Sequence, residues 1–132
     1  MRFILICAFW LVANPALADV DWHMCQPFEQ RINCIVDGDT LWIAGEKMRL
    51  AGVDTPEVEG HCSRERRLAE QASSLRLSLI RSGIISITRE GQDRFGRTLV
   101  RIQTQAGPVG HTLLDHRLAD IFGDGVRTDW CA

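Results

Sequence analysis

The sequence predicts an α+β fold in which five short strands form a small closed barrel and two helices pack against it. Three observations support this. Residues 40–44 favour extended structure and are followed by a turn signal. Residues 98–104 alternate Leu99 and Arg101 on one face with Val100 and Ile102 on the other. An apolar stripe at helical spacing lies within residues 63–82, and the 132-residue chain suits one small domain.

The expected elements follow one another from residue 31. An irregular arm over residues 19–30 leads to strands over residues 31–36 and 40–44, then to a third strand that starts at Lys47. The first helix begins with Ser63 as its cap, buries Leu68, Ala72, Leu75 and Leu79, and ends at Gly83. Strands over residues 84–89 and 98–104 come next. A second helix should run from Pro108 to Phe122, where Gly123 stops it.

The hairpin within residues 36–57 carries most of the acidic side chains of interest. A type II′ turn at Gly45-Glu46 would place Leu41 opposite Leu50. In that register Asp37, Asp39 and Asp54 converge on one face at the open end of the hairpin. Arg49 would point to the opposite face unless a bulge near Gly52 turned it toward the acids.

Three converging carboxylates repel one another unless a positive charge neutralises them. A hard divalent cation with oxygen ligands is the natural candidate. An EF-hand is excluded, because its loop needs an acid or Asn at the fifth position and Gly at the sixth, where this chain has Leu41 and Trp42. The alternative is a solvated acidic hairpin end, since acids are common at turns.

Three separate motifs resemble the signature of the staphylococcal nuclease family. They are DGDT at residues 37–40, with Arg49 on the following strand, DTPE at residues 54–57, and DRFGR at residues 93–97. The resemblance covers roughly residues 32–122. It implies an OB-type barrel of five strands with two packed helices, and hydrolysis of DNA, RNA or both to 3′-phosphate products with Ca²⁺ as cofactor.

The resemblance also implies a role for each matching residue. Asp39, Asp54 and the backbone carbonyl of Thr55 match the metal ligands, and Asp37 matches an acid beside the metal, outside its ligand shell. Glu57 matches the proposed general base. Arg49 and Arg97 match the two arginines that hold the phosphate. Phe95 stands where the best-known relative has a Tyr that stacks on the nucleotide, and a base can also stack on Phe.

The charge distribution fits a phosphate-binding middle region better than the overall charge does. The formal net charge is −2, which is not that of a generic nucleic-acid binder. Residues 64–101 nevertheless hold nine arginines against four acids. Their planar guanidinium groups suit bidentate contact with phosphate. The plainer interpretation, a solvated helix face, is the expectation for Arg66, Arg67, Arg76 and Arg81.

The start of the chain predicts export. Arg2, an apolar stretch over residues 3–13 and Ala16-Leu17-Ala18 together have the composition of a secretory signal peptide over residues 1–18. The mature chain would be a single domain over residues 19–132. We expect it to be periplasmic or secreted, monomeric and without a membrane segment.

Four cysteines remain in the expected mature chain: Cys25, Cys34, Cys62 and Cys131. In a small exported domain this number suggests two disulfides, with three possible pairings. We favour Cys25–Cys34, which closes a short loop, with Cys62–Cys131, which ties the tail to the body.

Two other functions compete with that of a nuclease. One is an OB-fold module that binds nucleic acid or another anion without cleaving it. The other is an interaction domain that Ca²⁺ stabilises. A pure binding module has no need of Glu57 or of clustered aspartates, which favours the enzyme.

Overall fold

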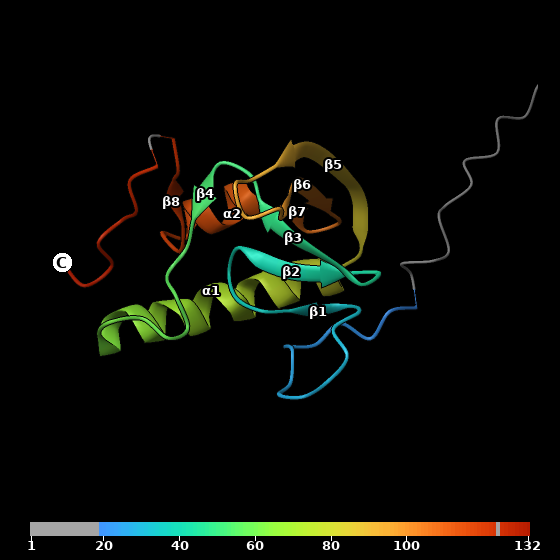
Figure 1. The fold of residues 1–132 in the computed structure, drawn as a ribbon, viewed down its shortest axis with the longest axis horizontal. Coiled ribbons are helices and arrows are strands. Elements are labelled where there is room, and N and C mark those ends of the chain that lie inside the picture. Colours follow the sequence, from blue (N-terminus) through green and yellow to red (C-terminus); the bar gives the residue numbers. More distant parts are fainter. Residues whose placement is uncertain (1–18, 124) are drawn as a thin grey trace, which may run out of the picture.

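The computed structural model describes residues 19–123 and 125–132, and Figure 1 shows how they are arranged. The predicted signal peptide, residues 1–18, lies outside the described residues. The elements, in chain order, are β1 (Cys34–Ile35), β2 (Thr40–Ile43), β3 (Glu46–Leu50), β4 (Val53–Asp54), α1 (Ser63–Arg81), β5 (Ile84–Gln92), β6 (Thr98–Thr104), β7 (Gly107–Pro108), α2 (Val109–Asp115) and β8 (Asp120–Ile121).

The main sheet confirms the predicted α+β class. Its strands lie in the order β1-β2-β3-β6-β5, with β7 paired to β6, and β4 pairs separately with β8. The five strands of the main path are the five that the sequence predicts. Two register shifts interrupt the pairing of β5 with β6, and β5 arches accordingly in Figure 1. Within the described ranges no pairing joins β1 to β5, so the hydrogen-bonded sheet is open where a closed barrel was predicted.

The hairpin uses a different turn from the predicted one. Ala44 and Gly45 have φ values of 50° and 79°, as a type I′ turn requires. Leu41 therefore pairs with Met48 instead of Leu50, and the predicted register is wrong by two residues. The amides of the turn explain the outcome: Ala44 N–H donates to Asn33 Oδ1 at 2.9 Å and Gly45 N–H to the Ile32 carbonyl at 3.0 Å. A shift of two residues keeps every side chain on its predicted face.

Helix α1 covers the core with a face that differs from the predicted stripe. Ala72 and Leu79 are buried as expected, but Leu68 and Leu75 are only partly buried, and the buried set also includes Ala69, Ser73, Arg76 and Ile80. Arg76 is fully buried, so the expectation of a solvated side chain is wrong for it. The cap is also one residue earlier than predicted, because Cys62 Sγ accepts the Glu65 N–H at 3.4 Å.

Helix α2 is shorter than predicted. It ends at Asp115, and Arg117 adopts a positive φ of 57°. Leu118 N–H donates to the Leu113 carbonyl and Arg117 N–H to the Leu114 carbonyl, the pattern that closes a helix through a left-handed residue. The chain then leaves the helix, and Ile121, predicted to be helical, pairs with Val53 in the small β4-β8 sheet.

Both disulfides have the favoured pairing. Cys25 is bonded to Cys34 and Cys62 to Cys131. Among the described residues there is no helix with the length and apolar character needed to cross a membrane.

Candidate active site

One buried arginine connects two of the predicted acids. Arg49, in β3, places Nη2 at 3.4 Å from Asp39 Oδ2 and at 3.9 Å from Asp54 Oδ1. All three side chains are almost fully buried. The structure therefore brings Arg49 to the acids, although strand alternation alone predicts the opposite face.

The path of the chain explains this contact without a bulge between β2 and β3. Asp39 lies in a bend before β2 and does not follow the alternation of the strand. After β3, a turn at Ala51 and Gly52, with Gly52 at a φ of 73°, sends the chain out of the main sheet. Asp54 then belongs to β4, which pairs with β8. Asp39, just before β2 of the main sheet, and Asp54, in β4 of the small sheet, thus contact Arg49 from different sheets.

Asp37 has a different environment from Asp39. Its Oδ1 accepts the N–H groups of Asp39 at 3.0 Å and of Thr40 at 2.8 Å. Burial, followed by the neighbouring Asp39 carboxylate, raises the pKa of Asp37 to about 6. Asp37 therefore holds the backbone turn that presents Asp39.

The residues around Thr55 fit a hard cation. Thr55 N–H donates to Asp39 Oδ2 at 3.3 Å, and its buried Oγ1 has no hydrogen-bond partner among the described residues. A Cβ at Gly38 would lie 2.8 Å from Thr55 Oγ1, so the backbone approaches there more closely than another residue would allow. Asp39, Asp54 and the Thr55 carbonyl offer the oxygen donors that Ca²⁺ prefers.

The acids do not form one tight cluster of three. Within the described part of the chain, only the two disulfide pairs, each with a glutamate, bring three potential metal-ligand atoms within 4.8 Å of one another. Guanidinium groups stand beside the acids instead, since Asp54 Oδ1 also lies 3.2 Å from Arg127 Nη2. Asp39 and Asp54 therefore already have positively charged side chains beside them, Arg49 and Arg127.

Glu57 lies on an exposed loop that Glu65 holds in place. The carboxylate of Glu65, in the first turn of α1, accepts the Glu57 N–H at 3.3 Å and the His61 N–H at 3.0 Å. Glu65 is only 7 % exposed. A Cβ at Gly60 would lie 2.4 Å from its side chain. Glu57 itself is ion-paired with Arg127.

The loop between β5 and β6 presents an arginine and an aromatic ring. Asp93 Oδ2 accepts a hydrogen bond from Arg97 Nε at 2.7 Å, and Oδ1 accepts the Phe95 and Arg97 N–H groups. Although burial raises the pKa of Asp93, these donors hold it below its ordinary value. Phe95 is 69 % exposed, and its ring lies 5.5 Å from the Arg97 guanidinium carbon. Asp93 thus fixes the loop, and Nη1 and Nη2 of Arg97 form no hydrogen bond within the described residues.

A cavity of about 760 Å³ joins these groups. Of the predicted catalytic, metal and substrate residues, all but the deeply buried Asp54 line it. They are Asp37, Asp39, Arg49, Thr55, Glu57, Phe95 and Arg97. Carboxylates, two arginines and an exposed ring around one cavity can hold a phosphate beside a cation and stack a base next to it.

Four residues that contribute to the candidate site were not identified from the sequence. Arg127 contacts Asp54 from the C-terminal tail, and no periodic pattern in the tail pointed to this residue. Arg76 and Glu65 looked like ordinary polar helix residues. Phe122, predicted to be helical, places its ring 5.2 Å from the Arg49 guanidinium carbon. For Glu65, the glycine at position 60, within the loop that Glu65 holds, offered a signal of close packing.

Comparison with known proteins identifies the family. Residues 47–126, more than half of the chain, match the staphylococcal nuclease homologue family. The chain belongs to this family. Arg49, Asp54, Thr55, Glu57, Phe95 and Arg97 fall within the matched residues, whereas Asp37 and Asp39 precede them and Arg127 follows them. Family membership supports a nuclease-like function.

The chain is also similar to a curated protein, the succinoglycan biosynthesis protein ExoI of Rhizobium meliloti (strain 1021). The two sequences are 40% identical over 68 residues, which is 48% of this chain and 36% of the relative. The match therefore spans about a third of the length of that relative.

Proposed function

We propose that the protein is an exported, Ca²⁺-dependent nuclease that hydrolyses phosphodiester bonds in DNA, RNA or both and leaves 3′-phosphate products. The observation that carries this proposal is the shared cavity, which is lined by two predicted phosphate-binding arginines, the predicted base and two predicted metal ligands: Arg49, Arg97, Glu57, Asp39 and Thr55. Two disulfides support export.

In this proposal Asp39, Asp54 and the Thr55 carbonyl would hold the cation, which would supply positive charge to neutralise the charge that develops on the phosphoryl oxygens. Arg49 and Arg97 hold the non-bridging oxygens of the phosphate from two sides, which is the usual use of a guanidinium fork. Arg49 is pre-oriented by Asp39 and Asp54, and Arg97 by Asp93. Because these side chains are already held, little reorganisation is needed as charge grows.

Glu57 would act as the general base. It takes a proton from water, the water oxygen bonds to phosphorus, and the bond from phosphorus to the 5′ oxygen breaks. The 5′ oxygen leaves as a hydroxyl after it takes up a proton, and the phosphate stays on the 3′ side. Glu65 contributes by holding the Glu57 loop through two backbone N–H groups. Phe95 supplies a stacking surface for a base beside the scissile bond.

The test is digestion of single-stranded DNA by the purified, oxidised protein, with Ca²⁺ and with a chelator. We expect cleavage only with Ca²⁺, and losses of roughly 10²–10³-fold in rate for Arg49→Ala and Arg97→Ala, since each removes one group that stabilises charge. Arg67→Ala is the matched control, because Arg67 is exposed on α1 outside the cavity. A folded wild type that binds Ca²⁺ and single-stranded DNA but does not cleave it would establish a binding module instead.

A further inference from the structure

The tail that follows β8 returns to the candidate active site. Gly125 and Arg127 line the same 760 Å³ cavity as Glu57 and Arg49. The residues that match the family end at position 126, so Arg127 is a feature of this chain beyond that match. Figure 1 shows the tail on the same side of the molecule as the start of α1.

Arg127 and Thr128 contact the carboxylate oxygens of Asp54 and Glu57. Arg127 Nη2 lies 3.2 Å from Asp54 Oδ1, and Nη1 is paired with Glu57 Oε1. Thr128 N–H donates to Asp54 Oδ2 at 3.3 Å. The Asp54 side chain is only 1% exposed, whereas that of Arg127 is 52% exposed. Both oxygens of a buried carboxylate are therefore engaged by a segment that lies at the surface.

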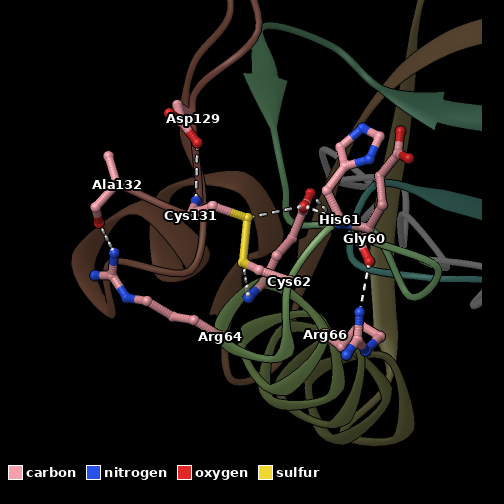
Figure 2. The surroundings of a disulfide bond; sticks show 10 residues. Gly60, His61, Cys62, Arg64, Arg66, Asp129, Cys131 and Ala132 are labelled. Atoms are coloured by element: carbon pink, nitrogen blue, oxygen red, sulfur yellow. Dashed lines mark hydrogen bonds between the residues drawn. A yellow bond between two sulfur atoms is a disulfide. The ribbon is translucent and has the colours of Figure 1, made fainter.

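Further contacts fix the part of the tail that follows Arg127. Thr128 Oγ1 donates to Oδ2 of Asp120, in β8, at 2.9 Å. Figure 2 shows the other anchor, where Cys131 is bonded to Cys62 at the start of α1 and the Ala132 carbonyl accepts a hydrogen bond from Arg64. Residues 125–132 thus form a strap that lies across Asp54 and Glu57.

We propose that Arg127, paired with Glu57, is an internal cation that competes with Ca²⁺ for Asp54, and that the Cys62–Cys131 bond keeps it in place. This inference rests on the proposed function, because it assigns Asp54 to the Ca²⁺ site. A guanidinium and a divalent cation at the same carboxylate oxygen repel each other strongly, and Arg127 lies 3.2 Å from Asp54 Oδ1, closer than Arg49 at 3.9 Å. Ca²⁺ binding therefore requires Arg127 and the Thr128 amide to leave Asp54, and the strap lowers Ca²⁺ affinity.

Calorimetric titration with Ca²⁺, without nucleic acid, tests the competition. We expect Arg127→Ala to bind Ca²⁺ about tenfold more tightly than the wild type, in line with the coupling of close charge pairs. The double variant Cys62→Ser/Cys131→Ser, which keeps Cys25–Cys34, should bind with intermediate affinity. Arg94→Ala is the matched control, since Arg94 lines the same cavity but stacks on Phe95 and, within the described residues, forms no ion pair with Asp54 or Glu57. Its affinity should equal that of the wild type.

Hydrogen exchange of the wild-type protein is a second test, and it requires no substitution. Saturating Ca²⁺ should speed exchange of the Thr128 amide, because its acceptor on Asp54 is taken. Equal Ca²⁺ affinity of the wild type and Arg127→Ala, or a Thr128 amide unaffected by Ca²⁺, overturns the inference and leaves the proposed nuclease intact. Absence of Ca²⁺ binding in both proteins overturns the proposed Ca²⁺ site and the inference with it.

Discussion

At the scale of single residues, Arg76 is the buried charge that faces the acids from α1. Its Nη1 donates to the Asp37 carbonyl at 3.2 Å, and Nε and Nη2 have no hydrogen-bond partner within the described residues. Burial lowers the pKa of Arg76 to about 10, while the Asp37 and Asp39 carboxylates oppose that shift. Arg76 in α1 and Arg49 in β3 therefore both supply positive charge near Asp39.

Replacing Arg76 should cost much of the stability of the domain. We expect Arg76→Met to lower the free energy of unfolding by about 3 kcal/mol, because it removes the counter-charge of the buried Asp37 carboxylate. Urea denaturation at pH 7 measures the change. Arg67→Met, on the exposed face of the same helix, should stay within about 0.5 kcal/mol of the wild type. Equal stability of the two variants would show that Arg76 does not compensate the acids.

At the scale of elements, Glu46 joins three strands at the turn end of the hairpin. Its carboxylate pairs with both terminal nitrogens of Arg89 in β5, at 2.7 and 2.8 Å, and accepts the Thr98 hydroxyl of β6 at 2.6 Å. The hydrogen bonds from Arg89, followed by that from Thr98, lower the pKa of Glu46 to about 2. The ionised carboxylate is thus the form that holds β3, β5 and β6 together.

This pairing predicts an acid-dependent loss of stability. The pKa falls from an ordinary 4.5 to about 2 on folding, so the stabilisation is present above pH 4.5 and disappears as the pH falls toward 2. Glu46→Gln should melt at a lower temperature than the wild type at pH 7, and the difference should shrink below pH 4.5. Thermal melts from pH 7 to pH 2 test this, with the exposed Glu70→Gln as control. A difference that does not vary with pH would exclude the ionised pair as its source.

At the scale of the whole molecule, the two disulfides constrain very different lengths of chain. Cys62–Cys131 spans 69 residues and joins the tail to α1, whereas Cys25–Cys34 spans nine residues beside β1. The longer closure removes more freedom from the unfolded chain. The tail bond therefore acts both on global stability and on the position of Arg127.

The two bonds should differ in their stabilisation. On loop-closure entropy alone, the long loop contributes about 4 kcal/mol and the short loop about 3 kcal/mol. We expect Cys62→Ser/Cys131→Ser to unfold at a lower urea concentration than Cys25→Ser/Cys34→Ser. Urea midpoints of the two double variants decide this, and the reverse order would mean that local packing around β1 outweighs chain entropy.

Much of the fold follows from local sequence patterns. Alternation predicts the strand over residues 98–104 with its correct ends, and helical spacing places the first helix within one residue at its start. The ends of elements were harder to predict, because they depend on partners distant in the sequence. Asn33 and Ile32 select the Ala44-Gly45 turn, and pairing with β4 takes Ile121 out of the predicted helix.

The sequence by itself determined the residue types of the candidate site: which acids and arginines the motifs contain, an aromatic ring at Phe95, and cysteines sufficient for two disulfides. Those properties depend on residue type and spacing, which are local. Only the tertiary structure decided how the charges are balanced. Arg49 reaches acids in two layers, Arg76 is buried against Asp37, and Arg127 returns from the tail to Asp54. Such pairs join residues up to 73 positions apart, where spacing along the chain carries no information about distance in space.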